Sequence, residues 1–286
     1  MRRFPHWLKK SIPEATTLQT EQILRRNQLN TICHSGKCPN RSECFSRGTA
    51  TFMILGNLCT RRCTFCSVPQ GAPSLVDWTE PSRVAQASYE LGLKHIVVTS
   101  VNRDDLPDGG ARIFYETILA VRRFITHATV EVLTPDFQGN QEAILRVAEA
   151  QPDIYNHNLE TIPRLYRRVR PGALYERSLN LIRTVKTHYP EMLTKSGLMV
   201  GLGEGAEEVL HVLRELREYG CDIVTLGQYL QPQQKRLPVV EFVTPETFAF
   251  YEREARVMGF KEVFSGPFVR SSYHAEEAFL RAKASS

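Results

Sequence analysis

The sequence predicts an α/β fold, a partial parallel barrel of six strand–helix units, and three observations support this. Short apolar runs rich in branched residues alternate with amphipathic segments. This alternation favours parallel strands, and nearly continuous apolar strands indicate a sheet covered on both faces. The 286 residues also approach the roughly 250 of a complete (β/α) barrel. An open doubly wound sheet fits the same pattern.

The six predicted strands follow one another at intervals that leave room for a helix after each. Their sequences are TFMILGN from Thr51, HIVVTSV from His95, TVEVLTP from Thr129, DIYNHNL from Asp153, SGLMVGL from Ser196 and DIVTLGQYL from Asp222. Between them, apolar residues recur with a 3.6-residue period, as at Phe114, Ile118, Val121 and Ile125. The last helix is expected over about 244–258, and one more over 20–29.

The chain divides into a core and two extensions. We expect an N-terminal extension over 1–50, the partial barrel over 51–266 and a C-terminal tail over 267–286, with both extensions closing over the active site. No Ser/Gly linker or low-complexity tract interrupts the core. A barrel of this kind carries its chemistry at the carboxyl ends of its strands.

Composition excludes several classes of protein. With 42% hydrophobic and 23% charged residues, the chain is neither disordered, fibrous nor a coiled coil. The net charge of +5 is too small to predict a nucleic-acid partner. No run reaches the ~18 apolar residues of a membrane helix, and the first residues lack a secretory pattern. We therefore expect a cytoplasmic protein that contacts neither nucleic acid nor membrane.

Seven cysteines are present, and six of them fall within 34 consecutive positions. Cys59, Cys63 and Cys66 form C-x3-C-x2-C shortly after the first predicted strand. Three thiolates on one loop can converge on a metal centre and leave one position open. A structural zinc with a distant fourth ligand is the alternative. The seventh cysteine, Cys221, is expected to be a core residue.

A second set, Cys33, Cys38 and Cys44, forms C-x4-C-x5-C. This spacing differs from the common zinc patterns, and nearby Gly and Pro residues suggest a loop that wraps around a second metal centre. A zinc site completed by His34 remains the alternative at this point.

The motif C-x3-C-x2-C after the first strand of a (β/α) repeat resembles the radical S-adenosylmethionine (SAM) superfamily. The resemblance implies a 4Fe-4S cluster whose open iron binds SAM, and an electron transfer that yields a 5′-deoxyadenosyl radical. It also implies a partial barrel of six units. Phe65 is then expected near the adenine, although an ordinary core position explains it as well.

Both cysteine sets together resemble the lipoyl synthase family. Further matching segments are ATFMILGNLCTRRCTFCSV, GLKHIVVTSVNRDDLPDGGA, VEVLTPDF, NHNLETIPRLYRRVRPGALYERSL and GPFVRSSYHA, so the resemblance runs from about Cys33 to Ala275. Thr64 stands where the family often has Pro, and Ser67 where it often has Asp; neither is a cluster ligand.

The family resemblance implies a sulfurtransferase with two 4Fe-4S clusters. Two SAM-derived radicals would act at carbons 6 and 8 of a protein-bound octanoyl-lysine, and the auxiliary cluster on Cys33, Cys38 and Cys44 would supply both sulfurs. Implied partners are an octanoylated lipoyl-carrier domain or glycine-cleavage H protein, a ferredoxin- or flavodoxin-type reductant, and an iron–sulfur carrier that rebuilds the cluster. We expect a monomer.

The RSSY element near the C-terminus is implied to contribute the fourth auxiliary ligand. By motif position this is Ser272, with Ser271 as the alternative. A serine oxygen is a harder ligand than a thiolate, so its iron would be the first to leave. Without the resemblance, the favoured interpretation of these serines is a C-terminal strand cap with two hydrogen-bonding hydroxyls; only the family resemblance overturns it.

Polar residues at the strand ends are the candidates for binding SAM. Thr99 and Asn102 follow the second strand, and Asn158, Glu160 and Arg170 follow the fourth. Carboxylate and amide groups can bind ribose hydroxyls, and Arg can pair with a carboxylate. The alternative is that these groups cap helices and bind water.

Two rival functions have distinct signatures. A sulfur inserter resembling biotin synthase would need auxiliary ligands other than C-x4-C-x5-C. A noncatalytic zinc module would bind zinc and ignore SAM. The basic stretch 164–170 is interpreted either as a docking face for an acidic carrier or as a solvated helix face.

Overall fold

The computed structural model describes residues 4–10 and 17–284. Seven strands form one sheet in which every neighbouring pair is parallel and the spatial order equals the chain order. The first and last strands are not paired, so the barrel stays open. The strands are β1 (Thr51–Ile54), β2 (His95–Ser100), β3 (Thr129–Leu133), β4 (Ile154–Asn156), β5 (Leu193–Val200), β6 (Ile223–Gln228) and β7 (Glu262–Gly266).

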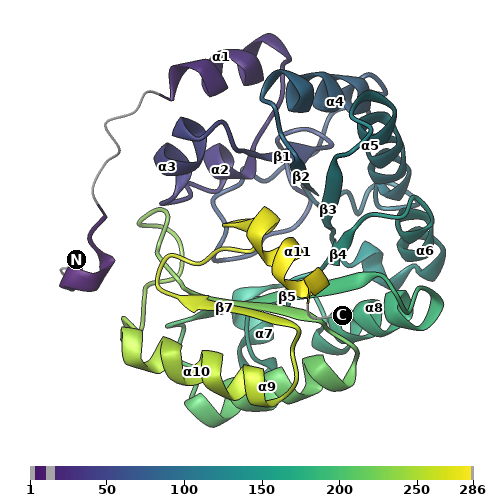
Figure 1. Cartoon of the computed structure of the whole chain (residues 1–286). Coiled ribbons are helices and arrows are strands. Elements are labelled where there is room, and N and C mark those ends of the chain that lie inside the picture. Colours follow the sequence, from purple (N-terminus) through teal and green to yellow (C-terminus); the bar gives the residue numbers. More distant parts are fainter. Residues whose placement is uncertain (1–3, 11–16, 285–286) are drawn as a thin grey trace.

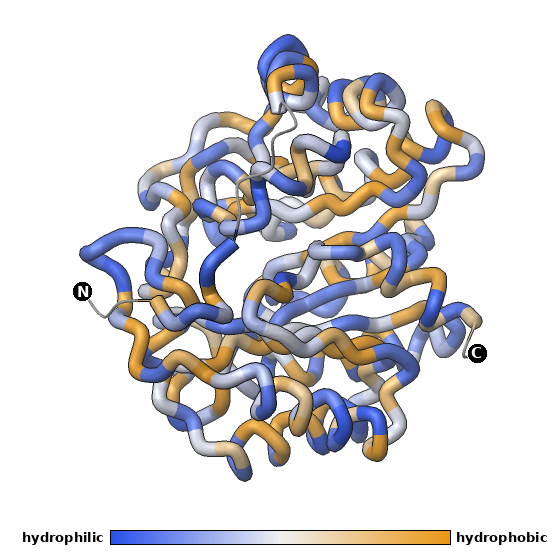
Figure 2. Tube along the Cα trace, turned by 60° about the vertical axis from the view of Figure 1, so that its left-hand side comes forward, coloured by the Kyte–Doolittle hydropathy of each residue, from blue (hydrophilic) through white to orange (hydrophobic). Residues whose placement is uncertain are grey.

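A helix follows each of the first six strands and packs on the outside of the sheet (Figure 1). Figure 2 shows hydrophobic and hydrophilic residues alternating along these helices, as expected of helices with one face on a core. The six predicted strand–helix units are therefore confirmed. The main helices are α4 (Glu80–Glu90), α5 (Ala111–Phe124), α6 (Gln141–Glu149), α8 (Tyr175–His188), α9 (Ala206–Glu218), α10 (Pro245–Val257) and α11 (Ala275–Ala284).

The strand β7 was not among the six predicted strands. It contains only five residues, and only its first two, Glu262 and Val263, are buried. A half-buried strand at the open edge lacks the long apolar run by which the other strands are recognised. The strand β5 is also longer than predicted, since it begins at Leu193 rather than Ser196.

The N-terminal extension is more helical than its sequence suggests. The helix expected over 20–29 is α1 (Leu18–Arg26), and the region expected as a loop contains α2 (Ile32–Ser35) and α3 (Arg41–Ser46). Short turns of helix also occur as η1 (His6–Leu8), η2 (Phe137–Gly139), η3 (Pro163–Leu165) and α7 (Tyr166–Val169). None of the described helices is long and apolar enough to cross a membrane.

The amino end of the barrel is closed by α11, which contacts β2 and β7 (Figure 1). Phe279 packs with Ile154, Leu193 and Ile223, the first residues of β4, β5 and β6. The Phe279 ring also stacks on His95, with centroids 5.7 Å apart. We call α11 the plug, because it covers the amino end of the barrel. The carboxyl end of the barrel stays open.

A buried ion pair crosses the barrel interior just above this plug. Lys195 Nζ lies 3.0 and 2.9 Å from the two carboxylate oxygens of Glu131, and Asn156 Nδ2 donates to the same carboxylate at 2.8 Å. Burial raises the pKa of Glu131, but the Lys195 ammonium, the His95 ring and the Asn156 amide together outweigh it, and the pKa lies below its ordinary value. The pair is fully enclosed and separates the plug from the open end.

Candidate active site

A cavity of about 370 Å³ lies at the carboxyl ends of the strands; we call it the front cavity. Its walls come from the ends of β2, β5 and β6, from the segments that follow β1 to β4 and β6, and from residues 32–39 and 269–272 of the two extensions. The loop after β1 carries Cys59, Cys63 and Cys66, and all three line the cavity. Backbone hydrogen bonds from Cys59 N to Pro69 O and from Gly71 N to Cys59 O, at 2.9 and 3.1 Å, close this loop at its base.

The three thiols of this loop influence one another through space. Burial raises the pKa of Cys63 and raises that of Cys66 to about 12, and the neighbouring thiols of the same set add to both shifts. The charge of Arg170 opposes the shift at Cys63. Asn102 donates two hydrogen bonds to Cys59 Sγ. Its backbone N–H lies 3.3 Å from the sulfur and its side-chain Nδ2 lies 3.8 Å from it.

Four buried polar atoms on the front cavity have no hydrogen-bond partner within the described part of the chain. They are Ser100 Oγ, Asn102 Oδ1, Thr134 Oγ1 and Arg170 Nε. Buried polar groups are almost always paired, so this concentration indicates that the cavity receives a polar ligand. The residues present therefore fit an amino-acid-like cofactor bound beside three thiolates.

All six residues predicted to contact SAM line the front cavity: Phe65, Thr99, Asn102, Asn158, Glu160 and Arg170. The Thr99 hydroxyl is already used, since it donates to Leu133 O at 2.8 Å. Gln228 and Tyr229, which follow the sixth strand, line the cavity as well.

Glu160 is held in an unusual conformation at the edge of β4. Its φ of 68° is in the left-handed region, which non-glycine residues seldom adopt. Burial raises the pKa of its carboxyl, while Arg170 and the Asn158 amide act in the opposite direction. Asn158 Nδ2 donates to Glu160 Oε1 at 3.0 Å, and Arg170 Nη1 donates to Asn158 O at 2.8 Å. The three side chains thus form one connected group.

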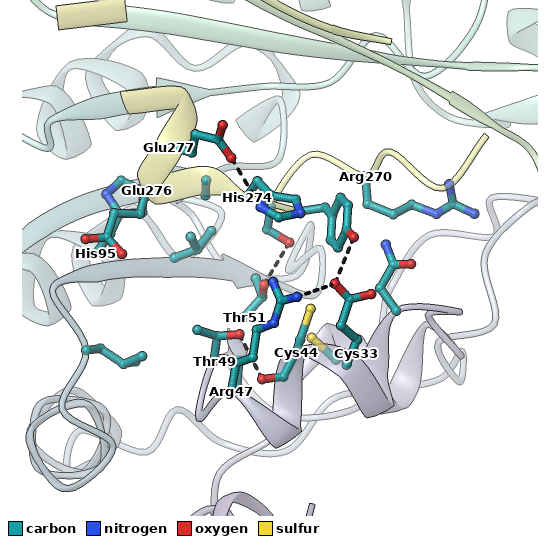
Figure 3. A pocket seen from close by; sticks show the side chains of 18 of the residues that line it. Cys33, Cys44, Arg47, Thr49, Thr51, His95, Arg270, His274, Glu276 and Glu277 are labelled. Carbon is teal, nitrogen blue, oxygen red and sulfur yellow. Dashed lines mark hydrogen bonds and ion pairs between the residues drawn. The ribbon is translucent and has the colours of Figure 1, made fainter. Parts of the chain in front are cut away.

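The second cysteine set lies on the opposite wall. Cys33 is in α2, Cys38 follows it, and Cys44 is in α3. Cys33 and Cys38 line the front cavity together with the first set. All three also line a larger cavity of about 660 Å³ on their other side, the rear cavity. Figure 3 shows the Cys33 and Cys44 side chains next to each other in this cavity, with His274 and Glu277 across from them.

The two serines of the RSSY element have different surroundings. Ser271 Oγ hydrogen-bonds with the Asn158 side chain, 2.6 Å from Nδ2, and lines only the front cavity. Ser272 Oγ accepts a hydrogen bond from Thr51 Oγ1 at 2.8 Å (Figure 3) and lines both cavities. Thr51 also hydrogen-bonds with the Cys33 thiol and lowers its pKa, although burial raises that pKa overall. Ser272 is therefore on the side of the second cysteine set.

Sequence reasoning gave no role to three residues that the fold brings to the site. Arg270 lines both cavities, and Cys38 and Glu160 lie within its electrostatic reach. Arg61 is buried in the front cavity and pairs with Asp104 at 2.8 Å. Lys10 pairs with Glu43, whose carboxylate also accepts from Tyr273 at 3.0 Å. The partners in these contacts lie 33 positions apart for Lys10 and Glu43 and 230 positions apart for Glu43 and Tyr273. No local sequence pattern could therefore have predicted them.

The thiols are not arranged as a mononuclear site. Within residues 4–10 and 17–284, no three His, Cys, Asp or Glu side chains are grouped closely enough to hold one metal ion. Cys221 is fully buried, as expected of a core residue.

The fold is an open parallel barrel, and the loop after its first strand carries three cysteines that line the front cavity. The family model of the radical SAM superfamily matches residues 53–216. A curated lipoyl synthase from Caldanaerobacter subterraneus is 57% identical over 98% of this chain and 99% of its own length. Another, from Rubrobacter xylanophilus, is 53% identical over 96% of this chain and 85% of its own length. The chain belongs to the lipoyl synthase family of the radical SAM superfamily.

Solved structures with the same fold are much more distant in sequence. Methylornithine synthase has a TM-score of 0.56 at 15% identity, covering 87% of this chain and 75% of its own. A maturase of the [FeFe]-hydrogenase has a TM-score of 0.59 at 13% identity, covering 94% and 67%. At these identities the likeness concerns the fold alone, and it confirms the predicted partial barrel.

Proposed function

We propose that the chain is a sulfurtransferase that inserts sulfur at carbons 6 and 8 of a protein-bound octanoyl-lysine. The observation that carries the proposal is the shared cavity. Cys33 and Cys38 line the same 370 Å³ space as Cys59, Cys63 and Cys66. A sulfur donor would therefore face a radical generator across the acyl chain, which is what a short-lived carbon radical requires.

The loop after β1 would hold the radical-generating cluster through Cys59, Cys63 and Cys66. When bound, this cluster supplies one electron to SAM and so generates the 5′-deoxyadenosyl radical. The residues that would bind SAM are Phe65, Thr99, Asn102, Asn158, Glu160 and Arg170. The unpartnered Asn102 Oδ1 and Arg170 Nε suit the amino and carboxylate groups of SAM, respectively. SAM and the acyl chain, when bound, would fill the cavity and keep water away from the radical.

The auxiliary cluster would be held by Cys33, Cys38, Cys44 and Ser272, and when bound it supplies the sulfur. The contact of Ser272 with Thr51, beside Cys33, supports Ser272 over Ser271 as the fourth ligand. Both extensions contribute to this site, the N-terminal one through its thiols and the tail through its serine. That arrangement supports the division into 1–50, 51–266 and 267–286.

A ring of exposed cations around the front cavity supports an acidic carrier as partner. Four segments contain no Asp or Glu: 22–42, 59–76, 161–175 and 227–240. They meet at the radical-cluster loop, where Thr64 Oγ1 donates to Arg168 O at 2.7 Å and Leu237 N donates to Thr64 O at 3.2 Å.

The cations of this ring are free to bind a partner. The exposed Lys37, Arg62, Arg167, Arg168 and Lys235 make no ion pair in the described part of the chain. We call these five residues the cationic ring. Within the basic stretch 164–170, by contrast, Arg164 pairs with Glu208 at 2.8 Å and Arg170 is buried. An octanoyl-lysine whose carrier displays carboxylates would be attracted to this entrance.

The remaining partners follow from the same proposal. A ferredoxin- or flavodoxin-type protein would deliver electrons, and an iron–sulfur carrier would rebuild the auxiliary cluster. We propose a monomer that works in the cytoplasm, where thiols stay reduced.

The test is anaerobic incubation of the reconstituted protein with SAM, a reductant and an octanoyl-lysine peptide. We expect 5′-deoxyadenosine together with peptide that has gained two sulfurs. Formation of 5′-deoxyadenosine with no sulfur in the peptide would contradict the proposal while leaving radical SAM chemistry intact. A Cys59→Ala variant is the control, because it should form neither product.

A further inference from the structure

The rear cavity is lined by all four residues proposed to hold the auxiliary cluster, Cys33, Cys38, Cys44 and Ser272, so it includes the space that this cluster would fill. It is the larger of the two cavities, at about 660 Å³, and it lies on the side of the auxiliary thiols that faces away from the SAM-binding residues. Four residues are common to both cavities: Cys33, Cys38, Arg270 and Ser272. The auxiliary cluster site therefore lies in the rear cavity and borders the front cavity through these shared residues.

The rear cavity reaches solvent between three structural elements. One wall is the segment 47–51 before β1, the second is the turn 91–95 after α4, and the third is the tail from Ser272 through α11. Thr49 and Leu280 on these walls are exposed. An ion or small molecule could thus approach the thiols from this side without passing the front cavity.

The three auxiliary thiols are unequal with respect to the two spaces. Cys33 and Cys38 line both cavities, whereas Cys44 lines only the rear one. An iron held by Cys44 would face the rear cavity. Carboxylate and imidazole groups from Glu43, His274 and Glu277 also line this cavity, where Glu43 pairs with Lys10 and Glu277 pairs with His274 and Arg281.

We propose that the rear cavity is the route by which iron and sulfide enter and leave the auxiliary site. The inference rests on the proposed function, because a cluster that gives up its sulfur must be dismantled and rebuilt. During turnover the front cavity is filled by SAM and the acyl chain. A second opening lets the cluster be replaced from behind, without displacing the molecules that fill the front cavity.

The test narrows the rear opening without touching any proposed ligand. Thr49→Trp and Leu280→Trp together place two indole rings at its mouth, one on each of two walls. Val257→Trp on α10 is the matched control, since Val257 is 79% exposed and lines neither cavity. All three are made in a background with Cys59, Cys63 and Cys66 replaced by Ala, so that bound iron reports the auxiliary site alone.

Iron exchange is the first readout, and it does not require catalysis. We expect removal of iron by a chelator, and reloading with ferrous iron and sulfide, to slow about tenfold in the double variant, a barrier higher by about 1.4 kcal/mol. The Val257→Trp control should exchange iron at the parent rate. The single Leu280→Trp variant serves if the double variant does not fold. Exchange at the parent rate in the double variant would overturn the proposal.

Single-turnover sulfur insertion is the second readout, measured with the three radical-cluster cysteines restored. The Trp variants, loaded with both clusters, should form product in one turnover as the parent does and slow only when the cluster must be replaced. A fall in the first turnover with unchanged iron exchange would also overturn the proposal. If the parent itself makes no sulfurated product, the proposed function fails, but the iron-exchange result still decides whether the route exists.

Discussion

Thr51 Oγ1 donates a hydrogen bond to Ser272 Oγ at 2.8 Å, across 221 positions of sequence. Thr51 begins the first strand, and Ser272 belongs to the tail that follows the last. The Thr51 side chain also contacts the Cys33 thiol. This contact brings both extensions of the chain to one side of the barrel and sets Ser272 apart from its neighbour.

The two serines of the RSSY element should therefore differ in their effect on sulfur transfer. Ser272→Cys should keep about eight irons per chain, but should suppress sulfur transfer because a thiolate holds its iron more tightly than a hydroxyl does. Iron analysis and product mass measure the two effects. Ser271→Ala is the matched control and should retain both iron and sulfur transfer. Full product yield from Ser272→Cys would show that Ser272 does not control cluster release.

Reversing charge in the cationic ring should weaken binding of an intact carrier domain. For Arg167→Glu with Arg168→Glu we expect KM for the carrier to rise about tenfold, since each exposed charge pair contributes up to about 1 kcal/mol. The rise should shrink at high salt, and a short neutral octanoyl-lysine peptide should be unaffected.

The matched control for the ring is Arg123→Glu. Arg123 is exposed near the end of α5, which leads into the amino end of β3, at the opposite end of the barrel from the front cavity. Steady-state kinetics with both substrates decide the matter. Equal effects of the ring and control variants on KM would rule out docking through the ring.

Replacing one partner of the buried Glu131–Lys195 ion pair should lower the free energy of unfolding. Lys195→Met leaves the Glu131 carboxylate enclosed without its cation, and such losses destabilise a protein by about 3–5 kcal/mol. Adding Glu131→Gln should restore most of the stability, because no buried charge then remains. Urea unfolding of the metal-free chain measures both changes. If the free energy of unfolding of Lys195→Met lies within about 1 kcal/mol of the parent value, the two side chains do not form a charged pair.

The free energy of unfolding should fall at acidic pH, because His157 binds a proton more readily in the unfolded chain than in the folded one. Burial, assisted by the charge of Arg170, lowers the pKa of His157 to about 4. Its ring bonds Thr134 O at 2.9 Å and Ser178 Oγ at 3.0 Å, a pattern that suits the neutral imidazole. The unfolded chain, with an ordinary pKa near 6.5, binds the proton more readily. The contribution of His157 to the free energy of unfolding should therefore be fully present above about pH 6.5. It should fall by up to about 3 kcal/mol as the pH drops to 4.

Urea titrations of the metal-free chain between pH 4 and 7.5 measure this slope. His157→Gln should flatten it over that window, although the variant begins from lower stability. His127→Gln is the control, since His127 is exposed and should leave the slope unchanged. An unchanged slope in His157→Gln would assign the acid sensitivity to other groups.

The chemistry-bearing residues were predictable because their signals are local. The motif C-x3-C-x2-C depends on the reach of one loop, and the six buried strands are recognisable from apolar runs without reference to their neighbours. Asn158, Glu160 and Arg170 were predicted to bind SAM because they follow a strand end, where barrels gather their polar groups, and all three line the front cavity. The strand β7 was missed because only its first two residues are buried.

The sequence by itself determined the class of fold, the two sets of thiols and the family, since each of these lies in short contiguous patterns. Only the tertiary structure decided how they share space: that Cys33 and Cys38 face both cavities, that Ser272 sits beside Thr51 and Ser271 beside Asn158, and that Arg164 is paired while Arg167 is free. The physical reason is that such relations join residues far apart in the chain. Their distances follow from how the whole barrel and its two extensions pack, and no local pattern encodes them.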